Sequence, residues 1–142
     1  MKKFISSKNI LTVSILWFLV AFMVAIMFFS YQENPISIVP VIIISLAIAL
    51  IIWVLLDTRY VIKNNNLYYR SGPIRGRIDV KKIKTVQYFS GLNIPVNTKP
   101  ALDTKGYIIS YNQFDAIYVS PKFTENFLAE LLKINPRILV TK

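Results

Sequence analysis

Positively charged side chains are concentrated between residues 70 and 84 of this 142-residue chain. The stretch begins with RSGPIRGR and continues with three lysines. Arginine guanidinium groups donate paired hydrogen bonds that match phosphate oxygens, and lysine ammonium groups add point charge. This pattern favours contact with anionic headgroups or an acidic partner rather than bond cleavage. The candidate contact residues are Arg70, Arg75, Arg77, Lys81, Lys82 and Lys84.

The residues that most catalytic and metal sites require are missing from this sequence. The chain contains no His and no Cys, which excludes Ser-His and Cys-His nucleophile pairs and the usual zinc, haem and thiolate ligands. Its aspartates are scattered and do not pair as acid and base, so we interpret them as turn and cap residues. We therefore predict a protein that is not an enzyme and has no catalytic, cofactor-binding or metal-binding residues.

The formal net charge is +10, and its distribution is uneven. After Leu56 the chain carries 14 of its 17 basic residues and six of its seven acidic residues. Such a surplus suits anionic lipid, nucleic acid or an acidic protein partner. No nucleic-acid-binding motif is present, so we expect no nucleic-acid partner.

Two long uncharged segments occupy the first part of the chain. Residues 9–32 and 34–56 contain no charged side chain, and each exceeds the roughly 20 apolar residues that a membrane-spanning helix needs. The first run is also longer than the ~7–15 apolar residues of a signal peptide, and a second run follows at once. We predict a transmembrane helical hairpin over residues 1–56, with spans at about 10–31 and 35–56.

Charges around the two spans predict their orientation. Glu33 is the lone charge between the spans, whereas Lys2, Lys3 and Lys8 precede the first and Arg59 follows the second. By the positive-inside rule, both termini of this multi-pass protein face the cytoplasm. Neither span contains an ionisable residue, which argues against a proton or ion path and indicates an anchor.

Residues 57–142 have the pattern of a separate domain that we expect to fold without the hairpin. Ser120 and Pro121 resemble the cap and first position of a helix that ends at Asn135. A helical apolar stripe lies between them, comprising Phe123, Phe127, Leu128, Leu131 and Leu132. β-Forming runs predict strands at 59–63, 67–70, 74–78, 85–89, 106–111 and 116–119, with a loop over 90–105. The pattern predicts an α+β domain, a small barrel or bent sheet plugged by the helix.

The order of these elements carries a resemblance to a known family. The most specific segments are Pro100-Ala101-Leu102 and Ser120-Pro121-Lys122. Residues 58–136 resemble a bacterial pleckstrin-homology-like (PH-like) domain family of small two-span membrane proteins. The resemblance implies a β-barrel closed by a C-terminal helix, without catalysis, in the bacterial inner membrane. Family members tend to carry Ser and Arg just after Pro-Ala-Leu, where this chain has residues 103–106 with the sequence DTKG.

These observations lead to one main hypothesis and one alternative. The main hypothesis is a membrane-anchored, non-enzymatic binding module that contacts a membrane protein, a peptide or an anionic lipid surface. The alternative is a protein of the bacteriocin-immunity or envelope-stress type that acts through its hairpin, to which the sequence bears a looser likeness. The sequence does not define an oligomeric state.

Overall fold

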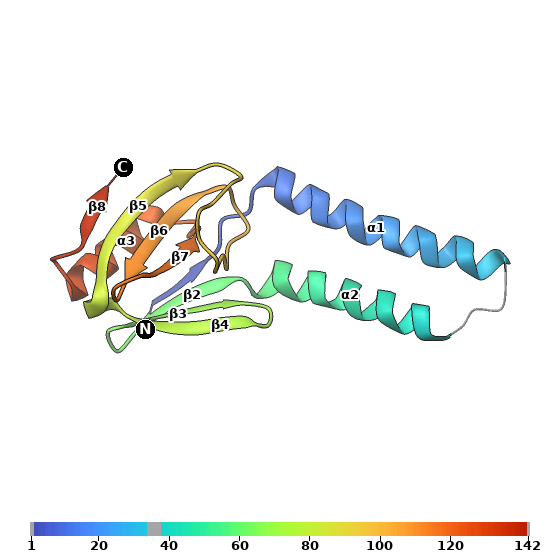
Figure 1. Cartoon of the computed structure of the whole chain (residues 1–142), viewed down its shortest axis with the longest axis horizontal. Coiled ribbons are helices and arrows are strands. Elements are labelled where there is room, and N and C mark those ends of the chain that lie inside the picture. Colours follow the sequence, from blue (N-terminus) through green and yellow to red (C-terminus); the bar gives the residue numbers. More distant parts are fainter. Residues whose placement is uncertain (1, 34–37, 142) are drawn as a thin grey trace.

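The structure, a computed structural model, describes residues 2–33 and 38–141. Two long helices, α1 (Ile10–Glu33) and α2 (Ile38–Asp57), project side by side from one end of a β-rich domain (Figure 1). Both helices are long and apolar enough to cross a membrane. Residues 34 and 35 of the expected turn lie outside the described residues, as does the expected start of the second span.

The β-rich domain contains two four-stranded sheets. The first has the order β1 (Lys2–Ile5), β2 (Arg59–Lys63), β3 (Asn66–Ser71) and β4 (Ile74–Asp79). The second has the order β7 (Asp115–Val119), β6 (Lys105–Tyr111), β5 (Ile83–Ser90) and β8 (Leu139–Thr141). A short 3-10 helix, η1 (Val80–Lys82), links them. The six predicted strands are confirmed, whereas β1 and β8 were not predicted.

The hydrophobic core lies among the two sheets and helix α3 (Thr124–Ile134). Alternate residues of the strands point inward, as Tyr60 and Ile62 do on β2. From α3, Phe127 and Leu131 are fully buried in the same cluster. The predicted core-facing stripe is therefore confirmed at these two positions, and the predicted helix end at Asn135 is confirmed as well.

Asn135 also fastens α3 to the link between the sheets. Its side-chain amide donates hydrogen bonds to the carbonyls of Val80 (3.1 Å) and Ile83 (3.1 Å), and its side-chain oxygen accepts from the Arg137 backbone (3.1 Å). Because Asn135 is buried, its side-chain amide and oxygen would lack partners without these bonds.

A closed barrel is not found among the described residues. Strand pairing stays within each sheet, and the outer edges of β1 and β7 approach each other only at one corner. There, Ser7 donates to the Ser120 carbonyl (2.5 Å) and Lys122 donates to the Ile5 carbonyl (3.0 Å). The expected barrel closure is therefore not confirmed.

The residues before the first span belong to the first sheet. Strand β1 runs antiparallel to β2, with Phe4 opposite Tyr60 and Ile5 opposite Arg59. The chain thus contributes one strand to the domain, leaves along α1, returns along α2 and completes the sheet. The predicted division of the chain placed residues 2–5 with the hairpin, whereas the structure places them in the domain.

The predicted helix cap at Ser120 is wrong. Helix α3 begins at Thr124, with Phe123 at the cap position and no side-chain capping bond. The Ser120 hydroxyl is buried and lies 2.9 Å from the hydroxyl of Ser6, which continues from β1. Phe123, expected in the core stripe, is 60% exposed because it lies ahead of the helix.

Candidate functional site

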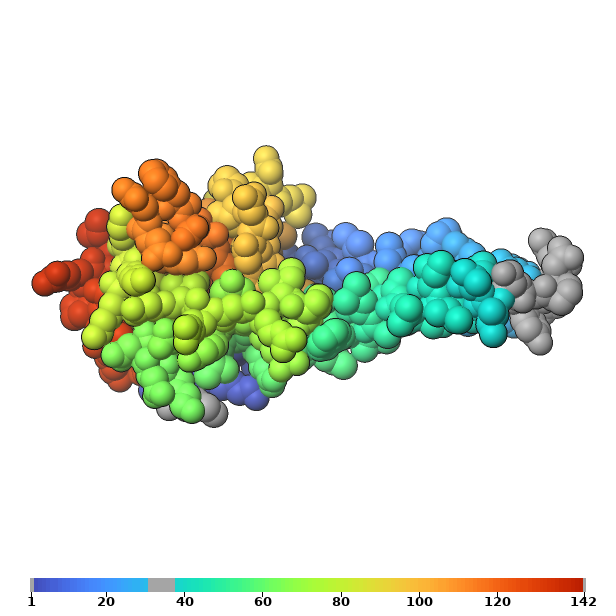
Figure 2. Space-filling view, turned by 60° about the horizontal axis from the view of Figure 1, so that its bottom comes forward, coloured from blue at the N-terminus to red at the C-terminus, as the bar shows by residue number. Residues whose placement is uncertain are grey.

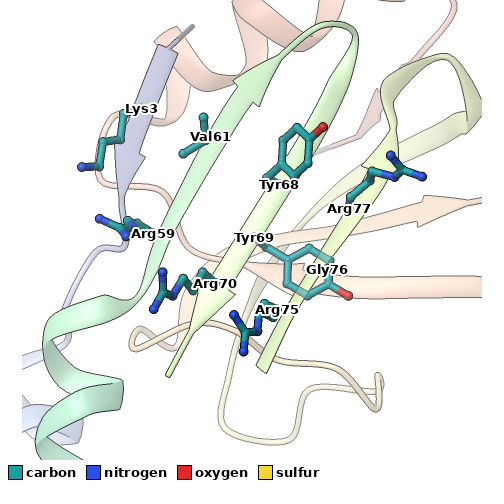
Figure 3. A pocket seen from close by; sticks show the side chains of 9 residues that line it. All are labelled: Lys3, Arg59, Val61, Tyr68, Tyr69, Arg70, Arg75, Gly76 and Arg77. Atoms are coloured by element: carbon teal, nitrogen blue, oxygen red, sulfur yellow. The ribbon is translucent and has the colours of Figure 1, made fainter. Parts of the chain in front are cut away.

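A basic groove lies on the outer face of the first sheet. Residues 59 and 61 on β2 point outward, because their neighbours Tyr60 and Ile62 fill the core. The same alternation turns Tyr68 and Arg70 on β3, and Arg75 and Arg77 on β4, to this face. The groove has a volume of about 560 Å3 (Figure 3) and is lined by Lys3, Arg59, Val61, Tyr68, Tyr69, Arg70, Arg75, Gly76 and Arg77.

Three arginines form a row across the strands at one end of the basic groove. Arg70 lies opposite Arg59 on one side and opposite Arg75 on the other. Like charges in directly opposite positions destabilise a sheet unless a counter-charge lies nearby. Asp57 supplies one such charge, since its carboxylate pairs with Arg70 Nε and lies 3.4 Å from Arg59 Nη2.

Asp57 neutralises only part of this charge. Its carboxylate also accepts a hydrogen bond from the Trp53 indole (3.2 Å), so this single charge is shared by Arg59, Arg70 and Trp53. Within residues 2–33 and 38–141, no carboxylate lies within 4.0 Å of a guanidinium nitrogen of Arg75 or Arg77. The groove therefore keeps a positive surplus that an anion from outside the chain could neutralise.

A second row lies one step further from the hairpin and mixes charge with an aromatic ring. Val61 lies opposite Lys3 on one side and Tyr68 on the other, and Tyr68 lies opposite Arg77. Tyr68 and Val61 thus form an apolar floor between Lys3 and Arg77. Cations around an apolar floor suit an amphiphilic anion better than a free inorganic ion.

Gly76 allows an aromatic ring to cover strand β4. The ring of Tyr69 lies over this glycine (Figure 3), and a Cβ atom at position 76 would come within 2.3 Å of the tyrosine oxygen. Any larger residue would displace Tyr69. The glycine is therefore required by a close approach on the inner face of the sheet, where Tyr69 packs against the hydrophobic core.

The hairpin positions the basic groove next to the end of α2. Strand β2 starts two residues after Asp57, the last residue of α2. The turn between β3 and β4 rests on the same helix end, since the Thr58 hydroxyl donates to the Val54 carbonyl (2.6 Å) and lies 2.8 Å from the Ser71 hydroxyl. Arg59, Arg70 and Arg75 are thus the row of the groove nearest to α2 (Figure 3).

The six predicted contact residues divide into three groups. Arg70, Arg75 and Arg77 line the basic groove together. Lys82 instead lines a separate polar pocket of about 410 Å3 with Asp79, Asn112 and other residues, and Arg77 lines both sites. Lys81 and Lys84 are exposed on η1 and β5 and line neither site.

Sequence reasoning missed Lys3 and Arg59 as groove residues. The outward position of Arg59 follows from the alternation along 59–63, so its side of the sheet was predictable from the pattern. Lys3 was not predictable in this way, because it reaches the groove only through the pairing of β1 with a strand that follows the hairpin.

The aspartates of the domain have structural partners. Asp79 accepts from the Lys81 backbone (3.0 Å), Asp103 accepts from the Ser7 hydroxyl (2.6 Å), and Asp115 accepts from the Asn112 amide (2.8 Å). With the further bond that Asp103 accepts from the Lys105 backbone (3.1 Å), these contacts confirm the interpretation of Asp79, Asp103 and Asp115 as turn and cap residues. The interpretation is wrong for Asp57, which forms ion pairs with Arg59 and Arg70.

The two segments that carry the family resemblance both hold the chain around the start of α1. Pro100 accepts a hydrogen bond from the Tyr60 hydroxyl (2.6 Å), and Leu102 accepts one from the Asn9 backbone (3.1 Å). Ser120 bonds to Ser6 and Ser7 as described above. A family model described as a bacterial PH domain matches residues 58–135, which is more than half of the chain.

This chain belongs to the bacterial PH domain family. The matched range begins at β2, so β1 and the helical hairpin lie outside it. Comparison with curated proteins and with solved structures finds no match.

Proposed function

We propose that this protein is a membrane-anchored, non-enzymatic binding module whose basic groove contacts the anionic headgroups of the bilayer that its hairpin spans. The observation that carries the proposal is the row Arg59, Arg70 and Arg75, which begins two residues beyond α2. An arginine near an anionic leaflet contributes ~1 kcal/mol of attraction, and guanidinium groups bind phosphate oxygens in pairs. The leaflet is cytoplasmic if both termini face the cytoplasm.

Distance from α2 separates the arginines from the lysines. Strands rise by ~3.3 Å per residue, so Asp79 lies about 13 Å beyond Arg75 along β4. Electrostatic attraction fades over a Debye length of ~8 Å at physiological salt. We therefore assign headgroup contact to Arg59, Arg70 and Arg75, with a smaller part for Lys3 and Arg77. The lysines of η1, at positions 81 and 82, contribute little.

The experiment uses the full-length protein and two variants that lose the same charge. One carries Arg75→Gln and Arg77→Gln, and the other carries Lys81→Gln and Lys82→Gln. Each is reconstituted in nanodiscs of mixed phosphatidylcholine and phosphatidylglycerol and released into mild detergent, and native mass spectrometry then counts the bound phosphatidylglycerol. The arginine variant should lose binding by about 2 kcal/mol at most, at ~1 kcal/mol per charge, and the lysine variant should resemble the parent.

Equal retention of phosphatidylglycerol by all three proteins would reject the lipid as the ligand of the groove. A partner protein would then be sought by crosslinking in native membranes with a photoreactive group at residue 68. Increasing salt distinguishes the two kinds of lipid contact. A loss shared by all anionic lipids indicates general attraction, whereas dependence on one headgroup indicates a specific pocket.

The exposed surface of the hairpin supports the alternative role. Only 6% of the apolar stretch of each helix is buried. On α1, the exposed rings of Phe18 and Phe22 stack with centroids 6.4 Å apart, and both are available to lipid or to another membrane helix. An immunity or envelope-stress function would reside in this surface. The discriminating test deletes the domain and retains the hairpin. Only the alternative predicts that the immunity or envelope-stress function survives this deletion.

A further inference from the structure

The two ends of the domain differ in the chemistry of their exposed tips. At the end that bears the hairpin, one tip is the turn over residues 71–74 and the other is the loop over residues 91–97. These tips have the sequences SGPI and GLNIPVN, with no charged residue in either. At the opposite end the turns carry Asn64, Asn65, Lys81, Lys82, Asn112 and Gln113.

The turn over 71–74 is fixed on the α2 side. Gly72 has a φ of +55°, and a Cβ there would come within 2.7 Å of the Val54 side chain. This close approach holds the turn against the last turns of α2. Ile74, which follows, is 47% exposed and has no place in the core.

The loop over 91–97 is fixed on the α1 side. The Gly91 backbone donates to the Thr104 carbonyl (3.0 Å), and the Thr104 hydroxyl accepts from the Asn9 side chain (2.9 Å). Asn9 immediately precedes α1, so the loop projects beside the start of that helix (Figure 2). Leu92, near its tip, is 88% exposed.

A single exposed apolar side chain is ordinary on a protein surface. Phe114 illustrates this, since it is 93% exposed in the turn between β6 and β7. That turn lies at the opposite end, because Asn112 donates to the Lys82 carbonyl (3.2 Å) and Val80 donates to the Asn65 carbonyl (2.9 Å), beyond the far end of β2. The position of the two uncharged tips, one beside each helix, distinguishes them from Phe114.

We propose that these two tips insert their apolar side chains into the interfacial layer of the bilayer that the hairpin spans. Apolar side chains of interfacial segments enter this layer to a depth of ~5–10 Å. With Ile74 beside α2 and Leu92 beside α1, the domain would contact the membrane on both sides of the hairpin. It would then sit in one orientation instead of swinging on its two connections. This contact is independent of the charge of the basic groove, so the two proposals can fail separately.

The test uses single cysteines, because the chain has no cysteine of its own. Leu92→Cys, Ile74→Cys and the control Phe114→Cys are each introduced into the full-length protein, labelled with bimane and reconstituted in phosphatidylcholine vesicles. Quenching is measured with iodide from the water and with lipids that carry a nitroxide at the headgroup or at a shallow acyl position. All three substitutions lie at exposed sites, so the folded domain should be retained.

The proposal expects the probes at 74 and 92 to be quenched by the nitroxide lipids and protected from iodide several-fold relative to the probe at 114. The probe at 114 should show the reverse pattern. Equal iodide quenching at all three positions would overturn the proposal. Protection from iodide without nitroxide quenching would overturn it too, because the tips would then be covered by protein and not by lipid.

Discussion

The ring of Phe4 packs edge-on against the ring of Phe127, with centroids 5.3 Å apart and planes at 88°. Phe4 lies before α1, and Phe127 lies in α3 near the C-terminus. Both side chains are buried in the same core cluster. The domain is therefore built from both sides of the hairpin, and both ends of the hairpin are fastened to it.

The first prediction concerns these two rings. Phe127→Ala should lower the free energy of unfolding by ~3–5 kcal/mol, since it opens a cavity in the core, and Phe4→Ala should have a cost of the same order. The measurement is denaturant unfolding of the full-length protein in detergent. Phe123→Ala is the matched control, and its exposed ring should cost less than ~0.5 kcal/mol.

The double variant tests whether the two rings interact directly. Aromatic pairs of this geometry contribute ~0.5–1.5 kcal/mol beyond buried area. Phe4→Ala combined with Phe127→Ala should therefore cost less than the two single changes together by about this amount. Strictly additive effects would show that the two rings do not stabilise each other.

The second prediction concerns how much of the chain the domain needs. The sequence pattern predicts that residues 57–142 fold alone, but this fragment lacks β1 and with it Phe4. We now expect a variant in which a Gly/Ser linker replaces residues 10–56 to show a cooperative thermal transition. The fragment 57–142 should melt at a lower temperature or without cooperativity, as followed by circular dichroism. Identical melting curves would show that β1 is dispensable.

Local patterns in the sequence were sufficient for most elements and insufficient for two of them. The two long apolar helices follow from the length of the uncharged runs, and the six strands follow from the β-forming runs. Strand β1 has only four residues, and its partner begins 54 positions after its own last residue, so no local pattern could pair them. The cap at Ser120 had the correct local signal, but the hydroxyl bonds to Ser6, a contact made possible only by the same distant pairing.

The candidate site shows the same limit. The density of basic residues along the chain grouped Arg70, Arg75 and Arg77, and these three line one groove because β3 and β4 are neighbours joined by a tight turn. It also grouped Lys81 and Lys82 with them, but β4 carries these lysines to the other end of the sheet. Proximity in the sequence predicts proximity in space across a turn and fails along an extended strand.

The third prediction concerns the buried hydroxyl of Tyr60. This group donates to the Pro100 carbonyl (2.6 Å) and accepts from the Ser120 backbone (3.1 Å), joining the two segments that hold the start of α1. Tyr60→Phe leaves both buried groups without this partner and should cost ~1–3 kcal/mol. Tyr68→Phe on the outer face is the matched control and should be nearly neutral.

The Tyr60 hydroxyl should also make the stability of the protein depend on pH in the alkaline range. Burial raises the pKa of its hydroxyl above the ordinary 10.0. Because the folded-state pKa is higher than the unfolded one, this contribution to stability is present below pH 10 and is lost as the pH rises above it. Tyr60→Phe should therefore lose less stability than the parent between neutral and strongly alkaline pH. Parallel pH profiles for the two proteins would contradict this assignment.

The fourth prediction concerns the ion pair between β1 and α3. Lys2 Nζ lies 2.7 Å from Glu130 Oε1, and Lys133 Nζ lies 3.0 Å from the same oxygen. The hydrogen bond from Lys2, with a further one from Lys133, lowers the pKa of the Glu130 carboxyl from its ordinary 4.5. The contribution is therefore present above pH 4.5 and is lost as the pH falls below it.

Hydrogen exchange of the β1 amides should consequently speed up at acid pH in the parent protein relative to the intrinsic rate. In Glu130→Gln it should already be faster at neutral pH and change less on acidification. Glu125→Gln, which removes a carboxylate from the first turn of the same helix, is the control and should behave as the parent. Equal protection of β1 in both variants would mean that the ion pair does not hold the strand.

The last prediction concerns topology. Pairing of β1 with β2 requires residues 2–5 and 59–63 to lie on the same side of any membrane that α1 and α2 cross, whichever side that is. The positive-inside rule then selects the cytoplasm, because the basic residues flank the outer ends of the spans and Glu33 is the lone charge between them. Gln113→Cys, in an exposed turn of the domain, should be labelled by a membrane-impermeant maleimide only after the cells are opened. A cysteine at residue 34 should be labelled in intact cells whose outer barrier admits the reagent.

Labelling of Gln113→Cys in intact cells would reverse the orientation and move the basic groove to the outer leaflet. Labelling of both positions from the same side would show that the helices do not cross the bilayer, and the anchoring role of the hairpin would then be rejected.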